Sequence, residues 1–180
     1  ALSQADATPE LKAHGAWVLH RLAKLDETAF LRLAKDDSAL VRSHSRRIAG
    51  TQKKWTTIVH QTVLDGLSDD SPHVRRAATD ALALQPHRDN VRPLLRALNT
   101  VPSRDVHLQH ALQIALRNNI RTAEKLADFD YLKTSKPALL NLLRVALAVE
   151  TPLSGELLLT NIESVQMNKT ELSKYLRHIA

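Results

Sequence analysis

Asp69-Asp70-Ser71-Pro72-His73-Val74-Arg75-Arg76-Ala77-Ala78-Thr79-Asp80-Ala81-Leu82 combines a turn, a helix start and an amphipathic helix. Pro72 suits the first turn of a helix, because the N–H group that proline lacks would have no partner there. Small or apolar residues follow Val74 at positions +3, +4, +7 and +8, which share one face of an α-helix. The stretch therefore predicts a helix that buries one side against a neighbouring element.

The same pattern recurs along the whole chain. Its first apolar positions are Leu11, Val41, Val74, Leu108, Leu139 and Leu172, separated by 30, 33, 34, 31 and 33 residues. Further amphipathic segments fill the periods at 27–35, 55–67, 90–98, 122–132 and 153–162. The fourth copy is ambiguous by one residue, since His110 could align with His44. A period in this range, with one helix pair per repeat, indicates a solenoid.

We therefore predict an all-α protein, a right-handed α-solenoid of about five to six antiparallel helix pairs that forms a single domain over residues 1–180. Composition agrees, because aromatic residues make up only 3% of the chain and glycine four residues, which disfavours a β-sandwich or barrel. The N-terminus, Ala1-Leu2-Ser3-Gln4, shows neither an initiator methionine nor a signal-peptide pattern. We expect a fragment of a longer chain.

Two copies carry a further signature, Asp36-Asp37-Ser38-Ala39-Leu40-Val41-Arg42 and residues 69–78. The pattern resembles HEAT repeats, in which a short acidic turn and a proline or small residue precede Val-Arg and an alanine-rich inner helix. The copies at Leu108 and Leu139 lack the arginine. Asp36 lies six residues before Arg42, and Asp69 lies six before Arg75. The resemblance implies that these residues are structural and form a ladder between adjacent repeats.

A narrower resemblance rests on Ala13-His14-Gly15-Ala16-Trp17-Val18-Leu19-His20, Leu25-Asp26-Glu27 and residues 105–112. These segments are similar to the HEAT-like middle region of large exported bacterial proteins that join a propeller-type dehydrogenase domain to a C-terminal c-type cytochrome. The resemblance implies flanking catalytic and haem-binding modules outside this sequence, and a periplasmic or exported location.

Charge suggests an anionic partner. The chain has 25 Lys and Arg against 19 Asp and Glu, which gives a net charge of +6. In HEAT-like stacks the second helix of each pair lines the concave surface, and here those helices and their edges carry Lys12, Arg21, Arg42, Arg46, Arg47, Arg75, Arg76, Arg117, Lys136 and Arg144. We predict Arg46, Arg47, Arg76 and Trp17 as candidates for partner binding on that surface. The alternative is an ordinary solvated face.

No arrangement of residues indicates catalysis or metal binding. Nine histidines are present, but adjacent helices pack roughly 8–10 Å apart, which is too wide for His14 and His44 to share an ion unaided. His107 and His110 alone would make a weak site. Cysteine is absent, which excludes disulfides, thiolate metal sites and c-type haem attachment within this sequence. We expect no enzyme, no cofactor, no metal and no membrane span.

Two functions remain open. The first is a non-catalytic scaffold or spacer within a larger protein, whose concave face binds a protein or peptide. The second is nucleic-acid binding by a basic concave face, as in HEAT-like alkylpurine DNA glycosylases. Those enzymes use aromatic side chains in a basic cleft, so the few aromatic residues of this chain disfavour an active version.

Overall fold

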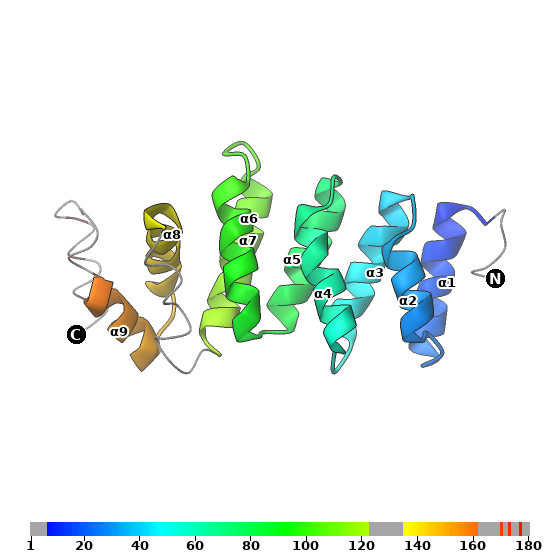
Figure 1. The fold of residues 1–180 in the computed structure, drawn as a ribbon, viewed down its shortest axis with the longest axis horizontal. Coiled ribbons are helices and arrows are strands. Elements are labelled where there is room, and N and C mark those ends of the chain that lie inside the picture. Colours follow the sequence, from blue (N-terminus) through cyan, green and yellow to red (C-terminus); the bar gives the residue numbers. More distant parts are fainter. Residues whose placement is uncertain (1–6, 123–134, 162–169, 171–172, 174–176, 178–180) are drawn as a thin grey trace. The chain divides into compact units, whose positions relative to one another are not determined.

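The structure is a computed structural model that describes residues 7–122, 135–161, 170, 173 and 177 (Figure 1). These residues form nine α-helices and two short 3₁₀ turns, and none of them lies in a β-strand. The predicted all-α class is confirmed for this part of the chain. The chain divides into two compact units, Ala1–Gln85 and Pro86–Ala180, which are described separately. The single domain, the handedness and the repeat number stay predictions.

Unit 1 contains two rows of helices. The helix α3 packs against both α1 and α5, and these three form one row. The second row consists of α2 and α4, which contact each other and the first row. The elements are α1 Pro9–Arg21, α2 Glu27–Ala34, α3 Ala39–Thr51, α4 Thr57–Asp65, the 3₁₀ turn η1 Gly66–Ser68 and α5 Pro72–Leu84. The two segments of each predicted period thus alternate between the rows.

Residues 69–82 form the turn before α5 and most of that helix. The five pattern positions of α5 are all buried: Val74, Ala77, Ala78, Ala81 and Leu82. Small side chains let α3 come close, since a Cβ atom added to Gly50 would lie 3.2 Å from the Cα atom of Ala81. The predicted buried face of α5 is therefore confirmed, and alanine there permits tight helix packing.

The buried face predicted for α1 is wrong. Leu11 and Val18 are 51% and 42% exposed, whereas Ala13 and Ala16 are buried. The reason is positional, because α1 contacts α3 and α2, and the side bearing Ala13 and Ala16 is the one that these helices cover. Periodicity identified residues that share a side of the helix, but it did not identify which side has a neighbour.

Unit 2 packs α6 against both α7 and α8, and α8 also contacts α9. Its described elements are the 3₁₀ turn η2 Arg88–Asn90, α6 Val91–Thr100, α7 Val106–Ile120, α8 Lys136–Ala146 and α9 Pro152–Asn161. Leu108, Ala111, Leu112, Ala115 and Leu116 of α7 are buried, which selects the register starting at Leu108. Most of the predicted segment 122–132 and most of the helix predicted after Leu172 lie outside the described residues.

A buried asparagine connects the beginning of unit 2 to α7. Asn119 Oδ1 accepts hydrogen bonds from the His87 backbone N–H at 2.7 Å and from Asn90 Nδ2 at 2.8 Å. Its Nδ2 donates to the Ala115 carbonyl at 2.7 Å. Both the oxygen and the nitrogen of the Asn119 amide therefore have hydrogen-bond partners in the interior, as a buried polar side chain requires.

Among the residues that the structure places, no helix combines the length and the apolar character needed to cross a bilayer.

Gly66 of η1 is required for space rather than for conformation. Its φ and ψ angles of −62° and −18° are ordinary helical values. A Cβ atom at this position would lie 2.9 Å from the Ala78 Cβ and 2.9 Å from the Arg46 Nε, closer than such atoms can approach. Ala78 and Arg46 thus occupy the space that a side chain at position 66 would need.

We expect Gly66→Ala to lower the free energy of unfolding of unit 1 by about 1–3 kcal/mol, because the added methyl group overpacks a filled interior. Urea denaturation followed by far-UV circular dichroism measures this, because the signal comes from the helices of both units and therefore also reports on the control. Gly155→Ala is the control, because nothing lies within 4 Å of a Cβ there. An unchanged midpoint for Gly66→Ala would show that the interior is not tightly packed at this point.

Candidate functional site

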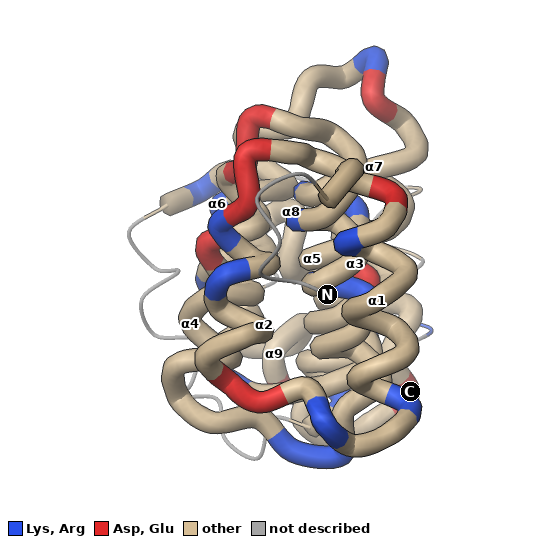
Figure 2. The backbone as a smooth tube through the Cα atoms, turned by 90° about the vertical axis from the view of Figure 1, so that its right-hand side faces the viewer, with Lys and Arg blue, Asp and Glu red and all other residues tan. Residues whose placement is uncertain are grey.

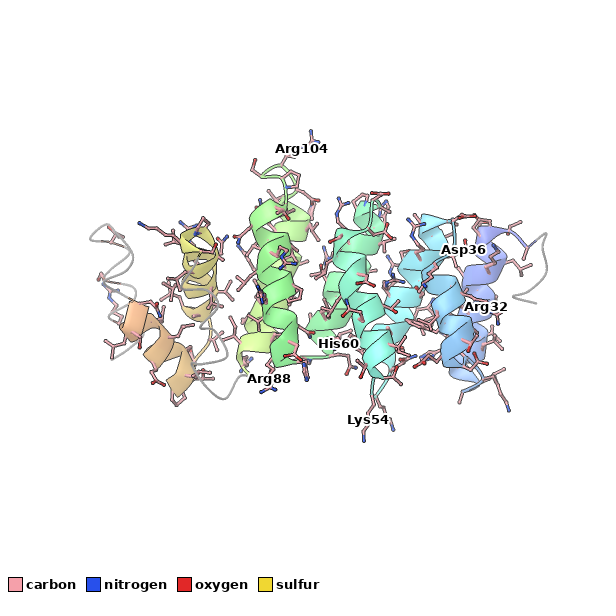
Figure 3. All side chains as sticks on the ribbon, viewed as in Figure 1. Arg32, Asp36, Lys54, His60, Arg88 and Arg104 are labelled. Atoms are coloured by element: carbon pink, nitrogen blue, oxygen red, sulfur yellow. The ribbon has the colours of Figure 1, made fainter. Side chains whose placement is uncertain are left out.

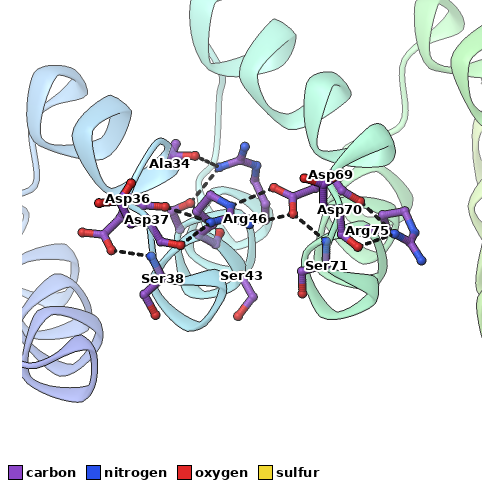
Figure 4. A network of polar contacts seen from close by, with 12 residues as sticks. Ala34, Asp36, Asp37, Ser38, Ser43, Arg46, Asp69, Asp70, Ser71 and Arg75 are labelled. Carbon is purple, nitrogen blue, oxygen red and sulfur yellow. Dashed lines mark hydrogen bonds and ion pairs between the residues drawn. The ribbon is translucent and has the colours of Figure 1, made fainter.

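A ladder of charged side chains links successive repeats of unit 1 (Figure 4). Arg42 binds Asp69 through two hydrogen bonds, Nε to Oδ2 at 2.8 Å and Nη2 to Oδ1 at 2.9 Å. One repeat earlier, Lys12 Nζ binds Asp36 Oδ2 at 2.9 Å. In each case a cation of one repeat reaches the turn carboxylate of the next repeat. The ladder therefore joins α1 to the turn before α3, and α3 to the turn before α5.

Each arginine of the ladder also closes the turn of its own repeat. Arg42 Nη1 donates to the carbonyls of Asp36 at 2.9 Å and Asp37 at 2.8 Å. Arg75 Nη1 donates in the same way to the carbonyls of Asp69 at 2.8 Å and Asp70 at 2.9 Å. The six-residue spacing thus brings each arginine to backbone carbonyls and not to the carboxylate of its own turn.

The structure also assigns the carboxylates a second contact. Asp36 Oδ1 accepts the backbone N–H of Ser38, and Asp69 Oδ1 accepts that of Ser71, both at 2.9 Å. Each aspartate therefore orders its own turn while it binds the cation of the preceding repeat. Lys12 is the member of the ladder that sequence reasoning missed, because α1 has a lysine where the signature has an arginine.

These contacts lower the pKa of both carboxyl groups. For Asp69 the main cause is the hydrogen bond from Arg42, which outweighs the opposing effect of burial. For Asp36 burial acts to raise the pKa, but the hydrogen bonds from Lys12 and from the Ser38 N–H lower it overall. Both side chains are therefore ionised at neutral pH, and the ladder is fully charged.

Arg46 lies in the interior and not on a partner-binding surface. It is only 4% exposed, and its Nη1 donates to the Ala34 carbonyl at 3.2 Å and to Ser45 Oγ at 2.9 Å. Its Nε has no hydrogen-bond partner among the described residues. Burial lowers the pKa of Arg46 to about 10, opposed by the charges of Asp69 and Asp65. This corrects the expectation that Arg46 is accessible to a ligand.

Trp17 and Arg47 belong to a polar cluster shared by α1 and α3, which we call the Trp17 cluster: Trp17, His20, His44, Arg47 and Thr51. The half-buried Trp17 donates its indole Nε1–H to His44 Nδ1 at 2.9 Å. His20 packs its ring edge-to-face on Trp17 at 5.9 Å between centroids, and its Nε2 lies 2.9 Å from Thr51 Oγ1. Burial, followed by the charge of exposed Arg47, lowers the pKa of His44.

The cluster gives His20 and His44 a structural role. His44 accepts a hydrogen bond with Nδ1, so its ring is neutral when this bond forms. Within residues 7–122 and 135–161, no three potential metal-binding side chains form a group that could hold an ion. The cluster is therefore an ordered hydrogen-bonded arrangement that fixes the orientation of the Trp17 ring.

Arg76, the last of the predicted candidates, forms an ion pair on the surface of α5. Its Nε lies 2.9 Å from Asp80 Oδ1, one helical turn away, and both side chains are about half exposed. An exposed pair of this kind contributes little to stability. The helix α5 belongs to the same row as α1 and α3, which carry Trp17 and Arg47. Arg76, however, has a carboxylate beside it that partly neutralises its charge.

Comparison with known proteins does not identify a family for this chain. The chain matches no protein-family model and no curated protein. Functional interpretation therefore rests on the residues and their arrangement.

We expect Asp69→Asn to lower the free energy of unfolding by about 1–3 kcal/mol at pH 7, because it leaves the half-buried Arg42 without a counter-charge. The folded pKa of Asp69 is lowered, so its stabilisation is present above the unfolded pKa of about 3.9 and is lost as pH falls through the folded pKa. Urea denaturation at several pH values measures both effects.

Asp80→Asn is the matched control for this measurement, since Asp80 belongs to an exposed pair within one helix. We expect it to change the free energy of unfolding by less than about 0.5 kcal/mol. Equal effects of Asp69→Asn and Asp80→Asn would show that the ladder contributes no more than a surface ion pair.

We expect the Trp17 indole signal in NMR spectra to move as pH falls below about 6.5, because protonation of His44 Nδ1 removes the acceptor. The folded pKa of His44 is lowered, so the stabilisation from its neutral form is complete above the unfolded value and declines as pH falls toward the folded pKa. His44→Gln retains an acceptor that does not titrate. A Trp17 signal that moves equally in His44→Gln would refute the assignment.

Proposed function

We propose that this chain is a non-catalytic scaffold of HEAT-like helical repeats, a right-handed solenoid of about five to six helix pairs, that binds a protein or peptide. Its binding surface is the row formed by α1, α3 and α5, the counterpart of the concave face in HEAT-like stacks. The observation that carries this proposal is the Trp17 cluster, where His44 holds the aromatic ring and the charge of exposed Arg47 acts on the same histidine.

Tryptophan and arginine are the residues that most often dominate the binding energy of protein interfaces. Trp17 is held by His44 and His20, so little side-chain freedom remains to be lost when a partner binds. Arg47 offers an exposed cation that can bind a carboxylate or a carbonyl of the partner. The indole N–H is already bonded, so the partner would contact the Trp17 ring through its carbon atoms.

The charged ladder supports the same function in a different way. Lys12, Arg42 and Arg75 hold the turns of successive repeats at fixed positions, which makes α1, α3 and α5 a pre-ordered surface. Pre-ordering favours binding because fewer groups must be immobilised on association. The narrower family resemblance extends the proposal: the chain would space the dehydrogenase and cytochrome modules of an exported protein.

Nucleic-acid binding is the alternative, and the net charge of +6 supports it. However, basic positions are interspersed with acidic ones along the backbone (Figure 2). Three of the arginines in the row already have counter-charges or are buried: Arg42, Arg46 and Arg76. Affinity for nucleic acid depends on several free cations that displace counterions from phosphates, so this arrangement favours a protein partner.

Selection of random twelve-residue peptides on immobilised chain tests the proposal. We expect peptides that bind the wild type and lose about tenfold in affinity with Arg47→Glu, because a hot-spot contact is worth about 1–2 kcal/mol. Arg32→Glu is the matched control, since it makes the same charge change on α2 (Figure 3). Isothermal titration calorimetry gives the affinities.

Two outcomes would contradict the scaffold proposal. The first is a failure to select any peptide whose binding depends on Arg47. The second is tight binding of duplex DNA that weakens steeply with increasing salt, which would favour the nucleic-acid alternative.

A further inference from the structure

Unit 2 contains a groove of its own. It has a volume of about 230 Å³ and lies between α7 and α8. From α7 it is lined by His110, Gln113, Ile114 and Arg117. The last three of these residues follow His110 by three, four and seven positions, so all four lie in a single stripe along the helix. The groove therefore has one polar wall that α7 alone supplies.

The second wall comes from α8 and the turn that follows it, through Arg144, Val145 and Ala148. Val145 is buried and Ile114 is half-buried, whereas Arg117 and Arg144 are exposed. The groove thus has an apolar floor and an arginine on each wall. A ligand that fits this pattern carries an apolar group and an anionic group close together.

Within the described part of the chain, the two arginines of the groove form no ion pair. Neither Val106–Ile120 nor Lys136–Ala146 contains an aspartate or a glutamate. The ladder arginine Arg42, in contrast, is bound by a carboxylate. Two guanidinium groups at one groove, without an ion pair among the described residues, favour an anion, and a planar guanidinium matches the geometry of a carboxylate.

The volume and the lining of the groove indicate which class of molecule supplies the carboxylate. Pockets for drug-sized ligands occupy roughly 300–1,000 Å³, so a groove of about 230 Å³ has room for one or two side chains of a peptide. Nucleic acid is disfavoured, because single strands stack their bases on aromatic side chains and duplexes need many phosphate contacts. The groove offers two arginines, and its floor is aliphatic.

We propose that the α7–α8 groove binds a short acidic segment of a partner protein. A glutamate or aspartate carboxylate of the partner lies between Arg117 and Arg144, and a neighbouring aliphatic side chain packs on Ile114 and Val145. This inference rests on the proposed peptide-binding function and extends it to unit 2. It also gives that function a chemical preference, an acidic residue next to an aliphatic one.

NMR titration of the isotope-labelled chain with the peptide acetyl-Gly-Ser-Leu-Glu-Leu-Ser-Gly-amide tests the inference. We expect saturable shifts of backbone amide signals on α7 and α8. Replacing the glutamate of the peptide by glutamine, or introducing Arg117→Gln or Arg144→Gln, weakens binding about three- to tenfold, because each change removes a charge-assisted hydrogen bond. Arg96→Gln is the matched control, since Arg96 is an exposed residue of α6 outside the groove.

Three results would overturn the inference. They are the absence of saturable shifts on α7 and α8, equal binding of the glutamine peptide, and binding of inorganic phosphate or oligothymidylate at these amides as tightly as the acidic peptide. The readout also separates this inference from the proposed function, because the Trp17 cluster lies in unit 1. Peptides that depend on Arg47 while the α7–α8 signals stay unchanged would reject the groove alone. Shifts on α7 and α8 without any Arg47-dependent peptide would reject the Trp17 surface and retain the groove.

Discussion

The bond between Arg42 and Asp69 is the constraint on which the architecture of unit 1 depends. One guanidinium group binds two carbonyls of the turn before α3 and both carboxylate oxygens of the turn before α5. It therefore fixes the start of one helix relative to the start of the next. Lys12 and Asp36 repeat the connection one step earlier. Stacking of the apolar faces provides the main driving force, and the ladder links the turns from which the stacked helices start.

Three arginines of α3 have different roles because they occupy different positions on the helix. Arg42 orders two turns, Arg46 lies in the interior beside Gly66, and Arg47 is the exposed cation of the Trp17 cluster. The three side chains have the same chemistry. Arg42 and Arg46 are one helical turn apart and lie on the same side of α3, where Asp69 acts on both, whereas Arg47 lies on another side. The buried Nε of Arg46, which has no hydrogen-bond partner among the described residues, is a cost to the fold, whereas the exposed Arg47 can bind a partner. Only Arg47 is therefore part of the proposed binding surface.

Much of the helical pattern could be predicted from the sequence, because helix caps and apolar spacing are local properties. The start of α5 carries Pro72 in its first turn as predicted, and the buried faces of α5 and α7 follow the repeat. The site was less predictable. The pairing of Asp36 with Lys12 and the burial of Arg46 depend on contacts between different helices. Likewise, Arg117 and Arg144 were visible as basic residues, but their common groove was not.

The sequence by itself determined that the described chain is helical, where its helices begin and which residues share a side of each helix. These properties follow from hydrogen bonds and side-chain spacing within a few residues. The tertiary structure decided which sides have neighbours, so that Leu11 is exposed while Val74 is buried. It also decided which carboxylate each cation binds. The physical reason is that Arg42 and Asp69 are 27 residues apart in the chain, and only the packing of α3 against α5 brings them together.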